Sequence, residues 1–195
     1  TNTSLFTFVH NGPTNNKGIR DDGPLQLPIT NSNVHQTSIS GTQVNGWSMY
    51  FASHYLISSA PATITTGEFS IEFWINPDSF SGSPMIIGNS NWDIGQNSGW
   101  RVYANTTGKI GLDISSGTFN VFPNVLTSIS SLTLNVWQHV LITRNTSNIV
   151  RCFINGVDAG GSVTYAASLD LRSSGTGPTT RIAYVVADGG VYQVY

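Results

Sequence analysis

The chain has 195 residues, a length that fits one globular domain with a substantial core. Charged residues make up only 9% of it, against about a quarter in ordinary soluble domains, whereas hydrophobic residues reach 39%. The net charge is -2, no basic cluster is present, and no apolar run reaches the length of a membrane helix. The composition therefore excludes disorder, a nucleic-acid partner and membrane insertion, and it predicts a surface of neutral polar side chains.

Short segments in which apolar and polar residues alternate recur along the chain, separated by clusters of Gly, Asn, Ser and Pro. In the clearest of them, residues 68–75, apolar side chains from Phe69 to Ile75 occupy every second position, as in a half-buried strand. The expected strands are 5–9, 47–51, 55–57, 68–75, 85–87, 100–103, 110–114 and 136–143.

A β-hairpin is predicted where residues 137–144 pair with 149–154 across the turn 145–148. Asn155-Gly156 follows, a dipeptide that favours a type I′ turn because both of its central residues need positive φ. No stretch has a convincing helical period with caps. Strands at roughly ten-residue spacing without helices predict an antiparallel two-sheet sandwich.

The organisation along the chain favours one unit. The most loop-like stretches are 30–46 and 173–180, and neither shifts the composition enough to mark a domain boundary. We therefore expect a single domain over residues 1–195, either processed or a piece of something larger, since the sequence starts at Thr1. Cys152 is the only cysteine, which excludes an intrachain disulfide, and its apolar neighbours predict a core position.

Four segments, in order, resemble motifs of the laminin-G-like, concanavalin-A-like jelly rolls. Residues 67–77 are similar to the family's F-T-I-E-F-W strand, and 47–56, 99–110 and 137–157 resemble three further motifs. The resemblance implies an all-β, two-sheet antiparallel jelly-roll sandwich. It also implies a binding role, because relatives recognise glycans or protein receptors, often with calcium at a loop rim. The opening strand followed by a long polar loop is similar to the version found in bacteriophage virion proteins.

The polar loop 88–99 is the predicted ligand site. An aromatic ring there can stack on a sugar while amides and a carboxylate bond its hydroxyl groups. The alternative for Trp92 is a loop plug that packs on the sheet edge, and Tyr165 and Tyr192 are weaker candidates for stacking. The predicted ligand-binding residues are Asn89, Asn91, Trp92, Asp93, Gln96 and Asn97.

Calcium is the one cofactor that the sequence suggests. It takes oxygen ligands, often on loops, and Asp93 with Asn91 would supply them. Asp158 and Asp188 lie in other Gly-adjacent loops. The alternative is that these side chains only stabilise turns.

Catalysis is not expected. Retaining glycosidases need two carboxylates about 5 Å apart. Glu68 and Glu72, the nearest equivalent, would be separated by roughly 13 Å along one strand. The motifs G-x-S-x-G and H-E-x-x-H are absent. The histidines are scattered at His10, His35, His54 and His139, and His139 matches a family position where packing in the core or on the sheet is expected.

We therefore expect a non-catalytic recognition module, lectin-like, that binds a glycan or protein receptor on a virion or cell-surface fibre. The alternative is a structural virion protein, such as a capsid decoration, fibre or tail component, that acts by assembly. Both interpretations predict an extracellular or virion-surface location and a homo-oligomer, with neighbouring virion subunits as partners in the second. A glycoside hydrolase of the same fold is the third alternative.

Overall fold

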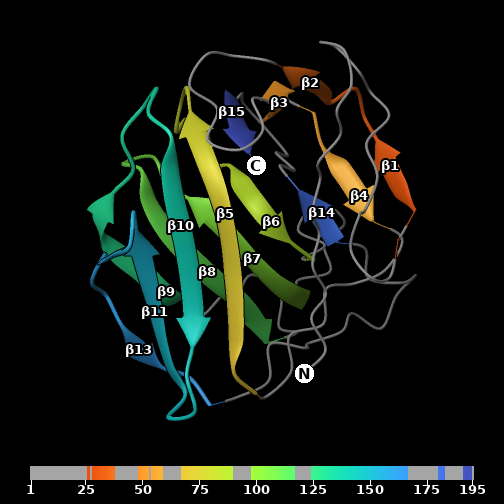
Figure 1. Cartoon of the computed structure of the whole chain (residues 1–195). Helices are drawn as coiled ribbons and strands as arrows, with labels where there is room; N and C mark the ends of the chain where they lie inside the picture. Colours follow the sequence, from red (N-terminus) through yellow and green to blue (C-terminus); the bar gives the residue numbers. More distant parts are fainter. Residues whose placement is uncertain are drawn as a thin grey trace.

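The computed structural model in Figure 1 describes residues 26, 28–37, 48–52, 54–58, 67–89, 98–116, 124–166, 180–182 and 191–194. These residues form strands, turns and connections. None of them belongs to a helix, so no helix in this part of the chain is long and apolar enough to cross a membrane. The all-β expectation is confirmed.

The strands form two sheets in which the described neighbours pair antiparallel, and Figure 1 shows one sheet in front of the other. Sheet A has the order β1 (Ile29–Asn31), β4 (Leu56–Ser58), β14 (Thr180–Ile182), β6 (Met85–Gly88), β7 (Ser98–Ala104), β8 (Lys109–Ser116), β9 (Asn124–Ser131). Sheet B has the order β12 (Val157–Asp158), β11 (Ile149–Ile154), β10 (Gln138–Arg144), β5 (Phe69–Pro77), β15 (Val191–Val194), β3 (Ser48–Ala52), β2 (His35–Thr37), with β13 (Val163–Thr164) also paired to β11.

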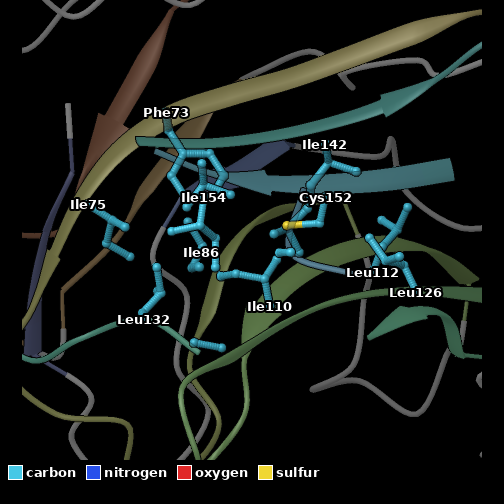
Figure 2. Packing of buried hydrophobic residues seen from close by; sticks show 14 of the residues in the cluster. Phe73, Ile75, Ile86, Ile110, Leu112, Leu126, Leu132, Ile142, Cys152 and Ile154 are labelled. Atoms are coloured by element: carbon cyan, nitrogen blue, oxygen red, sulfur yellow. The ribbon is translucent and has the colours of Figure 1, made fainter. Parts of the chain in front are cut away.

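The hydrophobic core lies between the sheets and follows from strand alternation. Phe73 on β5 and Ile142 on β10 point inward from sheet B, and they meet Ile110, Leu112 and Leu126 from β8 and β9 of sheet A (Figure 2). Each such side chain contributes about 1.5–3 kcal/mol when fully buried. The alternate residues of the same strands face outward, where the polar and partly exposed aromatic side chains gather.

Two chain corners close one side of the sandwich. The chain passes from β1 in sheet A to β2 in sheet B, and from β3 in sheet B to β4 in sheet A. The Ser32 N–H donates to the Tyr55 carbonyl at 3.0 Å, and the Tyr55 N–H donates to the Ser32 hydroxyl at 2.7 Å. Val34, beside them, is fully buried. The two crossings are thus bonded to each other over the end of the core.

A glycine-containing loop closes the opposite side. The N–H groups of Ile129 and Ser130 on β9 both donate to the Ala159 carbonyl, at 2.8 and 3.0 Å. Gly161 packs so closely that a Cβ there would overlap the carbonyl oxygen of Thr127. The connection between β12 and β13 therefore covers part of β9, the edge strand of sheet A, and protects it from pairing with another chain.

Most predicted strands are confirmed among the described residues. The alternation of 68–75 corresponds to β5, and the predicted hairpin corresponds to β10 and β11. Asn155 and Gly156 have φ of 52° and 78°, as a type I′ turn requires. The predicted strand 5–9 and most of the predicted loop 173–180 lie outside the described residues.

Two expectations about the strands were wrong. The stretch 30–46 is not all loop, because it holds the end of β1 and all of β2, short strands held by the bonded corners. β9 was not expected at all. Its pattern is partly inverted, since Ser128 is buried while Ile129 is 70% exposed. The Ser128 hydroxyl accepts the Ile110 N–H at 2.9 Å and donates to the Ser130 carbonyl at 2.7 Å, so its burial is compensated.

Cys152 lies fully buried on β11, which confirms its predicted core position (Figure 2). Burial, with a smaller effect from the charge of Asp158, raises the pKa of its thiol from 9.0 to about 12. A raised folded-state pKa means that the neutral thiol stabilises the fold. This contribution is complete below the unfolded-state pKa near 9.0 and is lost as the pH rises toward about 12.

We expect the stabilising effect of the Cys152 thiol to fall by about 1 kcal/mol between pH 9 and 10. The measurement is urea unfolding of wild type and Cys152→Ala at both pH values. The variant is less stable at pH 9 because it loses core packing. Its deficit relative to wild type should shrink by about 1 kcal/mol at pH 10. A constant deficit would show that the thiol does not titrate as its burial requires.

Candidate functional site

The hairpin of β6 and β7 carries the predicted ligand loop. Gly88 ends β6 opposite Arg101, and a Cβ at Gly88 would overlap the backbone carbonyl of Trp100. The Asn89 N–H donates to that carbonyl at 3.0 Å, and Asn89 Oδ1 accepts the Trp100 N–H at 2.9 Å. The two ends of the loop are therefore fastened to each other where the strands approach most closely, which gives residues 90–97 a rigid base.

Asn89 is the only predicted ligand-binding residue within the described residues. It is 7% exposed, and its carboxamide oxygen is occupied by the Trp100 N–H. Its position favours fastening of the loop over contact with a ligand, a role that the sequence pattern did not reveal. The other predicted residues lie outside the described residues, and their role in binding stays a prediction; they are Asn91, Trp92, Asp93, Gln96 and Asn97.

The calcium prediction also stays open at Asp93 and Asn91, and Asp188 likewise lies outside the described residues. Asp158 is described and already has partners. Its carboxylate accepts the Gly160 N–H at 2.8 Å and the Arg151 guanidinium at 2.9 Å, and these bonds hold the pKa of Asp158 below its ordinary value. Within the described ranges, no three His, Cys, Asp or Glu side chains are grouped so that they could hold a metal ion.

A polar cluster lies on the outer face of sheet A, on the strand that leaves the loop. Arg101 on β7 is opposite Asp113 on β8, and its Nε and Nη2 donate to Asp113 Oδ2 at 3.0 and 2.7 Å. Tyr103 is the next outward residue of β7, and its ring lies where a Cβ of Gly111 would be. The Arg101 guanidinium lies 4.9 Å from the centre of that ring. We call Arg101, Tyr103 and Asp113 the Arg101 cluster.

The electrostatics of the Arg101 cluster are set by burial. The Asp113 side chain is 7% exposed and that of Arg101 is 19% exposed. Burial raises the pKa of Asp113, and the hydrogen bond and charge of Arg101 offset only part of that rise. Burial and the Asp113 charge also raise the pKa of Tyr103. Because desolvation offsets the attraction, this ion pair adds little stability, and its main effect is to fix a guanidinium and a phenol ring in place beside the loop.

The sequence analysis did not single out the Arg101 cluster, although a signal existed. The chain has only 8 Lys and Arg and 10 Asp and Glu. Arg101 and Asp113 both fall on the polar side of strands whose alternation is clear. Because the chain has so few charged residues, two opposite charges on neighbouring strands are candidates for a cross-strand ion pair. Their register, however, depends on how the two strands align.

His139 has the expected packing role, on the sheet surface rather than in the core. Its ring centre lies 5.2 Å from that of Trp74 at an interplanar angle of 54°, and its Nε2 lies 3.7 Å from Glu72 Oε1. His54 is placed elsewhere, with Nε2 3.2 Å from Asn33 Nδ2. His35 is on β2, and His10 lies outside the described residues.

The remaining sequence candidates do not form an active site in the described part of the chain. Glu72 lies on the outer face of β5, and Glu68 lies four residues earlier in the chain, just before the strand, a separation too long for a retaining pair. Tyr165 packs against the core and donates its N–H to the Asn148 carbonyl, which does not favour it as a free stacking surface. Tyr192 lies on β15.

Two antiparallel sheets packed face to face place this chain in the jelly-roll class of β-sandwiches. Residues 51–184 match the laminin G model described as the concanavalin A-like lectin/glucanases superfamily, and the chain belongs to this family. No curated protein sequence shows significant similarity to it.

Solved structures share the fold at low identity. The binding domain of Paraclostridial Mosquitocidal Protein 1 is 15% identical with a TM-score of 0.61, over 93% of this chain and 46% of that one. Botulinum neurotoxin type C, whose cell entry depends on interaction with two ganglioside molecules, is 13% identical. Its TM-score is 0.63, and the match covers 93% of this chain and 45% of that one. The ligand binding domain of botulinum neurotoxin serotype D, in complex with N-acetylneuraminic acid, is 18% identical. Its TM-score is 0.62, and the match covers 93% of this chain and 44% of that one. This chain thus spans less than half of each neighbour.

Proposed function

We propose that this domain is a non-catalytic recognition module that binds a glycan or a glycan-bearing receptor. The observation that carries the proposal is the fold itself. It is shared with botulinum neurotoxin type C, whose cell entry depends on two ganglioside molecules, and with a serotype D ligand binding domain in complex with N-acetylneuraminic acid. The family joins lectins with glucanases. The lectin function is favoured over a glucanase because Glu68 and Glu72, four residues apart along the chain, would be separated by roughly 13 Å, too far for a retaining pair.

Loop 90–97 is the contact site that we propose. The Asn89–Trp100 hydrogen bonds hold together the two chain ends from which it departs, so these ends need not be ordered when a ligand binds. The Arg101 cluster extends the same hairpin with a guanidinium and an aromatic ring, groups that bind hydroxyl and carboxylate oxygens and the apolar face of a sugar.

The setting of this function is also part of the proposal. We place the domain outside the cell or on a virion surface, where a surface poor in charge suits adhesins and coats, and we expect it to act as a homo-oligomer. Sedimentation of the purified chain tests the oligomer. Calcium at Asp93 and Asn91 would rigidify loop 90–97 if it binds there.

The test is a glycan array probed with the purified chain in calcium and again in EDTA. We expect hits that weaken at least about tenfold in Trp92→Ala and in Asp93→Ala, because loss of a stacking ring or a central polar contact typically has this effect. Hits that survive EDTA would support glycan binding and contradict a role for calcium in it. Asp93→Ala removes both a proposed calcium ligand and a proposed direct contact to the glycan, so the comparison with EDTA is needed to separate the two effects.

The matched control is Asp158→Ala. Asp158 is also an aspartate near a glycine, but it lies exposed on β12 at the edge of sheet B, and its variant should keep the hits. Thermal unfolding must show that all variants are folded. A blank array on folded wild-type protein would contradict glycan recognition and would favour assembly as the function.

A further inference from the structure

The outer face of sheet B carries a second surface whose chemistry fits a ligand. Trp74 on β5 and His139 on β10 are cross-strand neighbours, and Glu72 follows on the same face of β5. We call Glu72, Trp74 and His139 the Trp74 platform. β5 and β10 run side by side in front of sheet A in Figure 1, so the platform lies on the opposite side of the molecule from the Arg101 cluster.

The aromatic part of the platform is fixed in orientation. Trp74 points away from the core because Phe73 and Ile75 beside it point inward. The indole is partly exposed, and the His139 ring, 23% exposed, packs against it with centres 5.2 Å apart. An indole held by a neighbouring ring offers a flat apolar surface at little entropic cost. That is the property by which aromatic side chains contribute to binding sites.

The polar part of the platform has bonding capacity left. Glu72 is 65% exposed, and its Oε1 lies 3.7 Å from His139 Nε2, which is too long for a hydrogen bond. A hydroxyl group placed between them would donate to the carboxylate and accept from the imidazole. A flat ring beside a donor–acceptor pair of this spacing matches the apolar face and the hydroxyl groups of a pyranose.

The charge around the platform decides which sugar fits. Arg151 lies on the same face, but its guanidinium is paired with Asp158 at 2.9 Å. Among the described residues of this face, the exposed carboxylate of Glu72 therefore has only the imidazole of His139 beside it. A sialylated or sulfated glycan would meet this negative charge, and the arginine described on this face, Arg151, is already paired.

We propose that the Trp74 platform is a second binding surface, for a neutral pyranose unit of a glycan, independent of loop 90–97. It rests on the proposed function only in taking the ligand to be a glycan. Two surfaces on opposite sheets would let one domain bridge two glycan chains, which raises the avidity for a dense glycan layer.

The test uses the full chain on an array of neutral and sialylated oligosaccharides, with wild type, Trp74→Ala, Trp92→Ala and Glu72→Gln side by side. We expect a set of neutral hits that falls at least about tenfold in Trp74→Ala and persists in Trp92→Ala, separate from the hits of loop 90–97 that Trp92→Ala weakens. Glu72→Gln should weaken these hits, because an amide accepts a hydroxyl less strongly than a carboxylate, and it should increase the signal from sialylated glycans, because it removes the negative charge. If Trp74→Ala does not fold, Trp74→Leu takes its place in the experiment, because leucine keeps apolar volume but has no flat ring.

The alternative outcomes separate the two proposals. Hits that are lost in Trp92→Ala but unchanged in Trp74→Ala would overturn the platform and leave the proposed function standing. A blank array would overturn both. Self-association of the wild type that disappears in Trp74→Ala, without neutral hits, would assign this face to a second copy of the chain instead of a glycan.

Discussion

Arg144→Ala is expected to lower the free energy of unfolding by about 3 kcal/mol. Arg144 takes an inward position at the end of β10 and is only 1% exposed. Its Nε donates to the Gly67 carbonyl at 2.8 Å, Nη2 donates to the same oxygen, and the guanidinium lies 5.0 Å from the centre of the Phe69 ring. The alanine variant removes these charge-assisted bonds and the packing of the side-chain stem together.

The matched control is Arg151→Ala on the neighbouring strand. Arg151 points outward, is 46% exposed and pairs with Asp158 at the surface, and exposed pairs contribute at most about 1 kcal/mol. Urea unfolding of both variants gives the comparison. Equal losses would mean that the buried guanidinium is not a structural element. Arg144→Met, which keeps the apolar stem without the charge, should lose less than Arg144→Ala.

The burial of Arg144 has a consequence beyond stability. Gly67 lies two residues before Phe69, the first residue of β5, so the bond from Arg144 ties the start of β5 to the end of β10. These two strands carry Trp74 and His139. A variant that loosens this end should therefore be tested for binding only after its folding has been measured, because the platform depends on the alignment of the same two strands.

The sequence predicted those strands whose two faces differ in polarity. In β5 apolar residues occupy every second position from Phe69 to Ile75, with Trp74 as the one aromatic residue on the other face. The hairpin of β10 and β11 ends in the Asn155-Gly156 turn, so local patterns were sufficient. β9 was missed because the buried Ser128 bonds to Ile110, a residue 18 positions away. Local polarity cannot reveal a compensation that depends on the pairing of two strands.

The candidate site shows the same limit. Asn89 was assigned to ligand binding from its place in a polar loop, but its partner is the Trp100 backbone, 11 residues along the chain. An asparagine that fastens a loop and one that binds a sugar look alike in sequence. Arg101 and Asp113 were overlooked for the opposite reason, since each looks like an ordinary surface charge until the register of β7 and β8 places them opposite each other.

Gly161→Ala is expected to lower the free energy of unfolding by about 3 kcal/mol, through two separable effects. Gly161 has φ of 77°, a left-handed conformation that disfavours alanine. In addition, the new Cβ would overlap the Thr127 carbonyl oxygen, which belongs to the backbone of β9 and cannot rotate away. The loop must then lift from β9 and weaken the bonds of the Ala159 carbonyl to Ile129 and Ser130.

Gly156→Ala separates the two effects. Gly156 has nearly the same φ, 78°, but a Cβ there would meet open space, so only the conformational penalty of about 1 kcal/mol applies. Urea unfolding should therefore show a gap of about 2 kcal/mol between the variants. Sedimentation should show self-association beyond the wild-type state in Gly161→Ala alone, because lifting the loop exposes edge-strand N–H groups beside the already exposed side chain of Ile129. Equal losses without self-association would mean that φ, rather than the covered edge, sets the need for glycine at this corner.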